Sequence, residues 1–420
     1  MKNFFNTILI FYIILNISSA SIAYNREVFF LVSLFYIAIS ISLYKTKYEL
    51  KFVLLFITWL VINVFSFTYF SVSLPIFRII IYSVSLLFLP YLLIKNLKDE
   101  FWMRFESIIY VLTIISLFLF PLNVMFNHIF DNLRSVFEVF TYPSRYSIKQ
   151  YWSIFIYTNA YMDDFIGLFR NSGFMWEPGG FAMMLIWALC YHWLKSDKMK
   201  FDKRAIIYII AILTTFSIAG YIALVVVIAA FFVKKISFYN VSLLILFLSI
   251  SFYYYQRLEF FTNKMDVYID SFEEDPTGRS GNINKKVNRF QGGVTAVLRT
   301  LEYPLGYGIM NAKERNDYLY SYGVNGLASI LEMWGFFVFP VLLFLLRKCL
   351  ILYGNNKSII MINLMFIGLL VMFFSNPISR NIFFYLLIMT PLCYKKNKFI
   401  TEELKLDVNL SSVENDINNK

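Results

Sequence analysis

An arginine and a glutamate lie seven positions apart in a glycine-rich stretch of the chain, Arg170–Ala182. Pro178 suits the first turn of a helix, because its missing N–H is not needed there. This predicts that Glu177 is the helix N-cap, where the positive end of the helix dipole favours a carboxylate. Arg170 could then bind an anion while Glu177 takes a proton from a hydroxyl group. The alternative is structural: Glu177 caps the helix and pairs with Arg170.

Two further arginines, Arg289 and Arg299, lie on a predicted amphipathic helix. Its apolar residues recur at helical spacing and form one stripe, made of Val287, Phe290, Val294, Val297, Leu298 and Leu301. The two arginines fall on the opposite side of that helix, about 15 Å apart along its axis. We expect both guanidinium groups to face a polar cavity or water; a simple solvated face is the alternative.

A glycine-rich turn follows this helix, from Glu302 to Asn311. It contains two tyrosines, Tyr303 and Tyr307, whose amphipathic rings suit the C–H faces of sugars. The alternative is that the turn is structural.

The elements that must position these residues are membrane helices. Hydrophobic residues make up 59% of the chain and charged residues 15%, against about half and about a quarter in soluble domains. Long apolar runs recur, and we expect helices because the bilayer core offers no water to backbone groups. The twelve predicted spans are Phe4–Tyr24, Val28–Tyr44, Phe52–Phe70, Leu74–Ile94, Ser107–Leu122, Phe174–Leu194, Ala205–Ile218, Ala219–Val233, Ile236–Tyr255, Val324–Leu346, Ser358–Phe374 and Ile382–Tyr394. The predicted fold class is an all-α polytopic membrane protein with about twelve transmembrane helices.

Basic residues predict the orientation of these spans. Lysines and arginines gather in connections that share one face if both termini are cytoplasmic, so the two long loops, about residues 123–173 and 256–323, are external. Residues 257–317 carry nine basic and nine acidic side chains. The net charge of +11 is then a topogenic signal rather than a nucleic-acid-binding surface. Residues 1–400 form one membrane domain, and the polar residues 401–420 are predicted to be a disordered cytoplasmic tail.

Two parts of this topology have alternatives. Residues 205–233 as one helix would be about 44 Å long, against a bilayer core of about 30 Å, so we predict two helices broken near Ser217–Gly220. The N-terminal run, which follows Lys2, has the pattern of a cleaved signal peptide as well as of a first span. We favour a retained span, because one lysine is a thin basic region for a signal peptide.

The chain shows no residue spacing typical of a metal or nucleotide site. Its three cysteines, Cys190, Cys349 and Cys393, are predicted near the cytoplasmic face, so no disulfide framework is expected in the external loops. Its two histidines lie on opposite sides of the membrane in this topology, far from any zinc-ligand spacing. We therefore expect no metal and no cofactor.

These stretches resemble the O-antigen polymerase/ligase superfamily over about residues 25–395. The similarity is carried by Arg170–Gly179, by Leu213–Tyr221, by Arg289 with Pro304–Gly308, and by Asn325–Gly335. Ligases of this superfamily carry a histidine after the second-loop glycines, whereas Arg315–Tyr318 contains none. The chain therefore resembles the Wzy-type polymerases of O-antigen or capsular polysaccharide.

The resemblance implies a metal-independent, inverting glycosyltransferase. It would transfer a growing glycan from undecaprenyl diphosphate onto a lipid-linked repeat unit at the outer face of the bacterial cytoplasmic membrane. Glu177, Arg170 and Arg289 would be catalytic, with Glu177 as the base. The substrate-binding set would be Arg299, Gly173, Trp176, Tyr303, Tyr307, Arg380 and Arg78, of which the last two could equally snorkel to the headgroups.

The partners implied are an undecaprenyl-diphosphate-linked oligosaccharide and the lipid bilayer, with a chain-length regulator and a flippase as further candidates. Two other functions stay open, an O-antigen ligase and a lipid-linked oligosaccharide flippase or transporter. Transporters usually place ionisable residues along midplane helices and often show internal repeats. No repeat is evident in the sequence. Glu332 lies inside a predicted span, where a carboxylate is by default a functional hint; the alternative is that a hydrogen bond to a neighbouring helix satisfies it.

Overall fold

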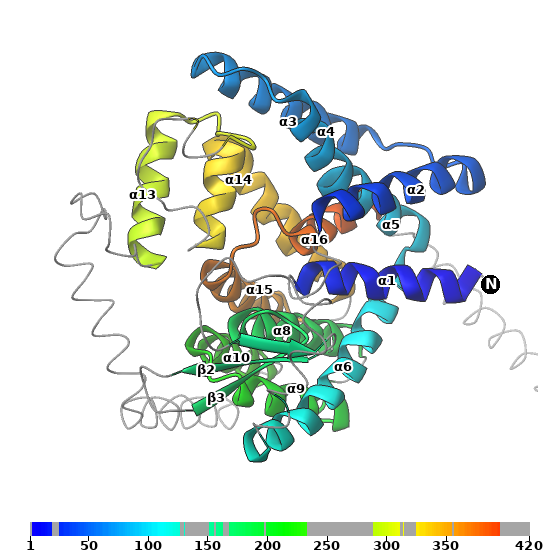
Figure 1. The fold of residues 1–420 in the computed structure, drawn as a ribbon, viewed down its shortest axis with the longest axis vertical. Helices are drawn as coiled ribbons and strands as arrows, with labels where there is room; N and C mark the ends of the chain where they lie inside the picture. The colour runs from blue at the N-terminus through cyan, green and yellow to red at the C-terminus, as the bar shows by residue number, and fades with distance from the viewer. Residues whose placement is uncertain are drawn as a thin grey trace, which may run out of the picture.

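The computed structural model describes residues 2–18, 25–126, 130, 151–154, 157–162, 168–196, 199–232, 289–310, 314, 325–354 and 357–394. Within these residues helices dominate and pack around a large buried core (Figure 1). The predicted ninth span, Ile236–Tyr255, the histidine-free segment Arg315–Tyr318 and the tail at 401–420 lie outside the described residues.

The helices follow the predicted apolar runs. They are α1 (Lys2–Ser18), α2 (Arg26–Tyr44), α3 (Leu50–Tyr69), α4 (Ile76–Ser83) with the π-helical turn η2 (Val84–Phe88) and α5 (Leu89–Leu97), α6 (Asp99–Met125), α8 (Pro178–Lys195), α9 (Lys203–Thr214), α10 (Ile218–Phe232), α13 (Arg289–Glu302), α14 (Gly326–Tyr353), α15 (Ile359–Ser375) and α16 (Ile382–Cys393). In the described part of the chain, four helical stretches are long and apolar enough to cross a membrane, and shorter apolar helices accompany them. The long stretches are Leu50–Tyr69, Ile76–Leu97, Asp99–Met125 and Gly326–Tyr353. The structure agrees with a helical membrane protein, while the number of twelve spans stays a prediction.

Short polar side chains start several of these helices. Each accepts a hydrogen bond from a backbone N–H of the first turn, which would otherwise lack a partner. The capping residues are Asn25 for α2, Asp202 for α9, Asn325 for α14, Ser358 for α15 and Asn381 for α16. The polar residues between the apolar runs therefore determine where these helices begin.

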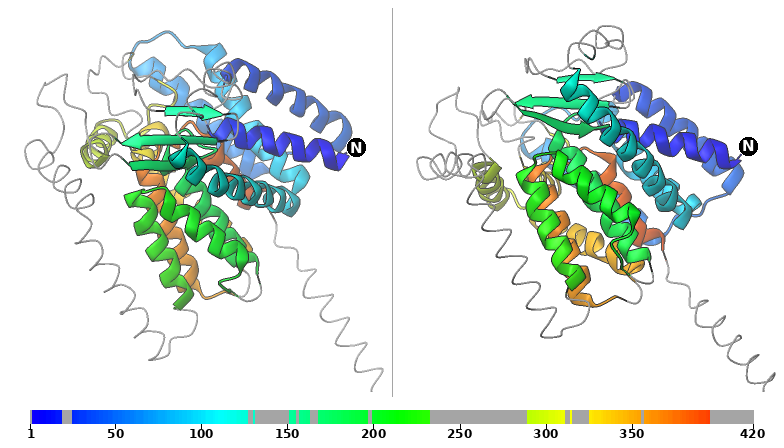
Figure 2. Two further views of the ribbon diagram at one scale, coloured as in Figure 1. Left: turned by 60° about the horizontal axis from the view of Figure 1, so that its bottom comes forward. Right: turned by 90° about the horizontal axis from the view of Figure 1, so that it is seen from below.

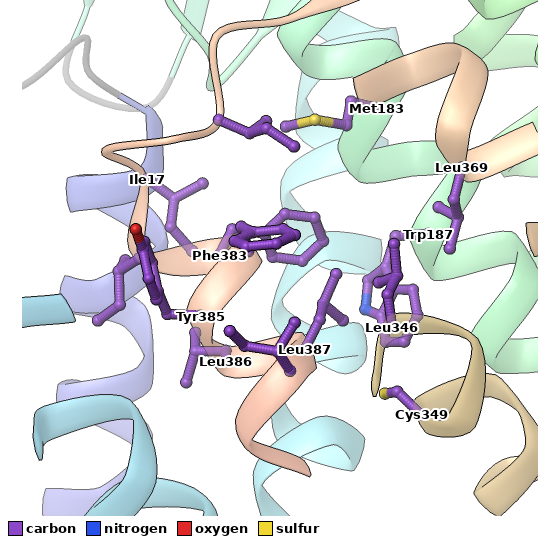
Figure 3. Close-up of a cluster of buried hydrophobic side chains, with 14 of the residues drawn as sticks. Ile17, Met183, Trp187, Leu346, Cys349, Leu369, Phe383, Tyr385, Leu386 and Leu387 are labelled. Carbon is purple, nitrogen blue, oxygen red and sulfur yellow. The ribbon is translucent and has the colours of Figure 1, made fainter. Parts of the chain in front are cut away.

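Helix α8 lies at the centre of the core, and nearly all of its side chains are buried. It packs against α6, α9, α10, α14 and α15. Figure 3 shows Trp187 of α8 near Leu346 of α14 and Phe383 of α16, and the ring centroids of Trp187 and Phe383 are 6.1 Å apart. The outer helices differ, because α2, α3 and α4 expose many large apolar side chains. Such a surface suits lipid rather than water.

A three-stranded antiparallel sheet interrupts the helical fold, which the all-α prediction did not include. Its strands are β1 (Tyr151–Ile154), β2 (Tyr157–Met162) and β3 (Leu168–Gly173), in the order β1-β2-β3. The aromatic stretch Tyr151–Tyr157, predicted to lie in the membrane interface, forms β1 and the start of β2. Aromatic and β-branched residues suit a strand, which explains the difference. The sheet lies at one end of the bundle formed by α8, α10 and α15 (Figure 2).

The predicted break within residues 205–233 is confirmed. Helix α9 ends at Thr214 and α10 begins at Ile218. Between them, Phe216 adopts a left-handed backbone conformation with φ of 47°. A non-glycine residue at such a φ ends a helix sharply, so the segment forms two short helices.

Helix α14 is also broken, at Gly335, whose φ of 76° and ψ of 172° are not helical. The turn after α13 fills the break. The N–H groups of Tyr307 and Gly308 donate to the carbonyls of Glu332 (2.7 Å) and Met333 (3.0 Å). The Phe336 N–H donates back to the turn (2.8 Å). Backbone groups freed by the break thus find partners within the protein, as a membrane environment requires. Glu332 therefore lies just before a break, not within the unbroken span that was predicted.

We expect Gly335→Ala to destabilise the fold strongly. Its backbone region is adopted almost only by glycine, at a penalty on the order of 1–3 kcal/mol for other residues. A β-carbon there would also lie 2.4 Å from the Pro304 oxygen. Thermal unfolding of purified protein in detergent, followed by size-exclusion chromatography, measures the loss. The control is Val341→Ala, an exposed position of the same helix. Equal midpoints for the two variants would show that the break is not required.

Candidate functional site

Residues predicted from both loops gather at one end of the helix bundle, where α1 and α15 end and α8 begins. The Trp176 N–H donates to the Ser18 carbonyl of α1 (3.0 Å). The side-chain oxygen of Asn376, which follows α15, lies 3.1 Å from where a β-carbon of Gly179 would stand. We call this end of the bundle, which also carries the sheet, the site end.

Arg170 lies on β3 and holds the turn between α9 and α10. Its Nε donates to the Thr215 carbonyl (3.0 Å) and its Nη2 to the Phe216 carbonyl (2.9 Å). Both carbonyls belong to the C-terminal end of α9, where the helix dipole favours a positive charge. The half-buried Arg170 therefore positions this turn, in addition to bringing a positive charge to the site end.

Asn171 was not predicted as a site residue, although it lies in the motif. It is fully buried and connects β3 to two helices. Its Oδ1 accepts from the Ser116 hydroxyl of α6 (2.7 Å) and from the Gly173 N–H (2.9 Å). Its Nδ2 donates to the Thr214 hydroxyl of α9 (3.0 Å). Asn171 thereby fixes the strand that carries Arg170.

Gly173 and Trp176 were both predicted to bind substrate, but the structure buries Gly173 and leaves Trp176 partly exposed. Gly173 is buried, with φ of +55°, and a β-carbon there would lie 2.5 Å from the Phe181 ring. Only glycine fits this turn against α8, so Gly173 has a packing role. Trp176 is half-buried at the site end and stays a candidate for substrate contact.

Glu177 is the N-cap residue of α8, as predicted, with an extended backbone (φ −142°, ψ 152°). Its side chain makes no capping hydrogen bond. The capping part of the structural alternative therefore does not describe the structure, and the pairing of Glu177 with Arg170 stays a prediction. The half-buried carboxylate lies near the positive end of the α8 dipole and close to Gly180.

Arg289 begins α13, and its Nη1 donates to the hydroxyl of Ser375 at the end of α15. Its carbonyl accepts from Asn325 Nδ2 (3.1 Å). Among the described residues, Arg289 has no carboxylate partner. Ser375 adjoins Asn376, whose side-chain oxygen faces Gly179, two residues after Glu177. The structure therefore brings Arg289 of the second loop to the end of the bundle that carries Glu177.

Arg299 does not face a polar cavity or water, so this prediction was wrong. The side chain is 3% exposed, and its Nη1 lies 3.1 Å from Glu332 Oε1 in an ion pair. Glu332 is equally buried. The polar side of α13 faces the bundle because that is where its charge finds a partner. Arg299 thus ties α13 to the broken part of α14.

Tyr303 and Tyr307 are buried in an aromatic cluster with Tyr69, the last residue of α3, and with Phe70, which follows it. The Tyr303 ring lies 4.9 Å from Tyr69 and 5.3 Å from Tyr307, measured between centroids. Burial raises the pKa of the Tyr303 phenol, with Tyr69 as a smaller cause. Because other side chains cover both rings, the structural alternative for this turn describes them better than sugar contact.

Arg78 and Arg380 have different partners in the structure. Arg78 pairs with Glu314 of the second loop (2.5 Å). The Arg380 guanidinium lies 5.6 Å from the ring centroid of Tyr82, and that of Arg26 lies 6.0 Å from the same ring. Arg26, which begins α2, was not predicted. Aromatic faces attract cations, and Tyr82 thus gathers two arginines from distant parts of the sequence.

Sequence reasoning missed Asn171, Ser375, Asn376 and Arg26. Asn376 is the most informative of these, because it is buried and its Oδ1 has no hydrogen-bond partner among the described residues. Its Nδ2 donates to the Met372 carbonyl (2.7 Å), so the oxygen must be the atom that faces Gly179. The only sequence signal was an Asn-Pro pair directly after an apolar run, which marks a turn.

No family model, no curated protein and no solved structure matches the chain. In the described part of the chain, no group of three or more histidine, cysteine, aspartate or glutamate side chains could hold a metal ion. The functional interpretation therefore depends on the geometry of the site end and on the resemblance of the motifs.

We expect Glu332→Ala to lower stability by about 3–5 kcal/mol, because it removes the carboxylate that pairs with the buried Arg299 charge. The double variant Arg299→Met/Glu332→Met should recover most of this loss, since it removes both buried charges. Unfolding midpoints of purified proteins in detergent measure the difference. If Glu332→Ala unfolds like the unaltered protein, the ion pair does not hold α13 in place.

Proposed function

We propose that the chain is a Wzy-type polymerase, a membrane glycosyltransferase that joins undecaprenyl-diphosphate-linked repeat units into O-antigen or capsular polysaccharide. The observation that carries this proposal is that Glu177, at the beginning of α8, and Arg289, from the second loop, both lie at the site end, where Ser375 and Asn376 stand between them. A base and an anion-binding cation on one surface are what this reaction requires.

The chemistry follows from the substrates. The acceptor hydroxyl gives its proton to the Glu177 carboxylate while its oxygen forms a bond to the anomeric carbon of the donor. The bond from that carbon to the diphosphate oxygen breaks, and the diphosphate leaves with the electron pair. Guanidinium groups stabilise the charge that grows on the leaving group. Because diphosphate leaves readily, no second carboxylate is needed as a general acid, unlike in glycosidases.

The arginines take different roles in this proposal. Arg289 is the main diphosphate ligand, because its described contact is a neutral hydroxyl and its charge stays available. Arg170 adds positive charge while holding the α9–α10 turn. Arg299 is a positioning residue, since Glu332 already neutralises it. Asn376 Oδ1, which has no hydrogen-bond partner in the described part of the chain, is suited to accept a hydrogen bond from a sugar hydroxyl near Glu177.

The proposed location is the bacterial cytoplasmic membrane, with both termini in the cytoplasm and the site end outside. Basic connections at the opposite end of the bundle support this orientation. There Lys357 Nζ donates to the Ser196 carbonyl (2.6 Å), which joins the α14–α15 connection to the α8–α9 connection. Lipid-linked repeat units and the bilayer are the direct partners in this proposal. A flippase that delivers the units and a chain-length regulator would work beside it.

Transporters also contain broken helices like α14, and they bind their ligands at the break. Here the break is filled, since the turn that follows α13 donates to the carbonyls of Glu332 and Met333. This arrangement favours the polymerase over a flippase or transporter. An O-antigen ligase has similar chemistry. Deletion of the gene distinguishes a polymerase, a ligase and a flippase by the glycans that remain.

A strain that lacks this gene should still display single repeat units on its surface but no long polysaccharide. This result follows if the enzyme only joins units that are already exported and attached. Gel electrophoresis of surface glycans, with a complemented strain as control, measures chain length. Loss of all attached glycan would indicate a ligase instead, and accumulation of units inside the cell would indicate a flippase.

Glu177→Gln and Arg289→Ala should each abolish polymerisation while leaving the amount of protein in the membrane near normal. Glutamine cannot accept the proton, and alanine removes the diphosphate ligand. The matched control is Arg347→Gln, because Arg347 bonds Asn363 (2.9 Å) in the half of α14 away from the site end. Incubation of purified variants with a defined lipid-linked unit measures activity. Full activity of Glu177→Gln would contradict its role as base.

A further inference from the structure

Helix α13 turns its polar side inward and its apolar side outward. The buried residues of α13 are Gln291, Gly292, Thr295, Ala296, Arg299 and Thr300. On the other side, Phe290 is 44% exposed, Val297 48% and Leu301 61%. A helix on a water-soluble surface shows the opposite arrangement, with its apolar stripe toward the core.

Specific contacts hold α13 in this orientation. The Arg299–Glu332 ion pair fixes its C-terminal half, and the contact of Arg289 with Ser375 fixes its beginning. Asn325 at the start of α14 donates to the Arg289 carbonyl (3.1 Å). Rotation that buried the apolar stripe would break all three contacts. The exposed apolar face is therefore a fixed surface of the protein.

The direction of α13 differs from that of the helices in the core. Figure 1 shows α13 beside the first part of α14 at the edge of the molecule, running across the direction of α1. The right view of Figure 2, turned by 90°, shows α13 nearly along its axis while α1, α6 and α8 are seen from the side. If α1, α6 and α8 cross a bilayer, α13 lies along the plane of its surface.

The exposed face of α13 continues onto surface that lipid would cover. Leu305, just after the helix, is 46% exposed. Phe336 and Phe337 of α14 are 54% and 67% exposed, and the Phe336 N–H is bonded to the Pro304 carbonyl beside Leu305. One apolar surface thus extends from α13 to the exposed side of the part of α14 that follows the break at Gly335. This part of the helix is long enough to cross most of a bilayer.

We infer that α13 is an interfacial helix whose apolar face is embedded among the acyl chains of the leaflet at the site end. A helix in the membrane plane with one apolar and one polar face has the geometry of such a segment. Its polar face, unlike that of a free amphipathic helix, is taken up by the protein. Arg289, its first residue, is then held at the depth of the lipid headgroups. The inference concerns the membrane and does not rest on the proposed reaction.

Site-directed spin labelling of the full-length protein in phospholipid nanodiscs tests this placement. Cysteines are introduced singly as Phe290→Cys, Val297→Cys and Leu301→Cys in a Cys393→Ser background, since the other native cysteines, Cys190 and Cys349, are buried. Phe337→Cys serves as the lipid-facing control. The water-facing control is Lys203→Cys, because Lys203 is exposed and begins α9 at the end away from the site end. Power saturation compares access to oxygen, which concentrates in lipid, with access to a water-soluble nickel complex.

The three α13 labels should favour oxygen over nickel several-fold more than Lys203→Cys does and resemble Phe337→Cys. Nickel access equal to that of Lys203→Cys at Val297 and Leu301 would overturn the inference, because the face would be in water. Low access to both reagents would also overturn it, since a protein partner would then cover the face. Three labelled positions on one face keep the test decisive if one variant fails to fold.

Discussion

Close packing of the Ser375–Asn376 end of α15 against the beginnings of α8 and α14 determines the rest of the site end. A β-carbon at Gly326 would lie 1.9 Å from the Asn376 carbonyl oxygen, so no other residue could stand there without movement. On the other side, Asn376 Oδ1 reaches the first turn of α8 at Gly179. Ser375 at the same time receives the Arg289 guanidinium. Arg289 and the beginning of α8, which are far apart in the sequence, therefore lie at one end of the bundle because one helix end fits between two glycines.

Much of this fold could be predicted from the sequence, because apolar runs of membrane length have few alternatives to helices. The break before Ile218 followed from length, and the N-cap position of Glu177 followed from Pro178. The orientation of α13 could not be predicted. Its apolar stripe was visible, but a hydrophobic pattern does not tell whether the stripe faces a protein core or lipid. The contact with Asn376 was also hidden, since packing between helix ends leaves no local pattern.

The partners of the arginines separate structural from chemical roles. Arg299 faces Glu332 with both side chains buried, and such a pair is held by mutual attraction where water is excluded. Arg170 and Arg289 instead donate to backbone carbonyls and a hydroxyl, which carry no net charge. These contacts orient each guanidinium through uncharged oxygens. The described partners of the three arginines therefore differ in charge, although the arginines looked equivalent in the sequence.

The depth of these groups in the membrane matters for the proposed chemistry. A lipid-borne diphosphate stays at the headgroup level, while its glycan extends into water. A cation that binds it must therefore be fixed at that level, and a flexible loop would not hold it there. Helix α13 meets this need if its apolar face lies in the leaflet, because Arg289 then begins a helix anchored on one side by lipid and on the other by the Arg299–Glu332 pair. On the same condition, the carboxylate of Glu177 at the beginning of α8 would lie in that layer. The break in α14 then acts on the site indirectly. Its free carbonyls bond the turn after α13, and this turn fixes the end of α13.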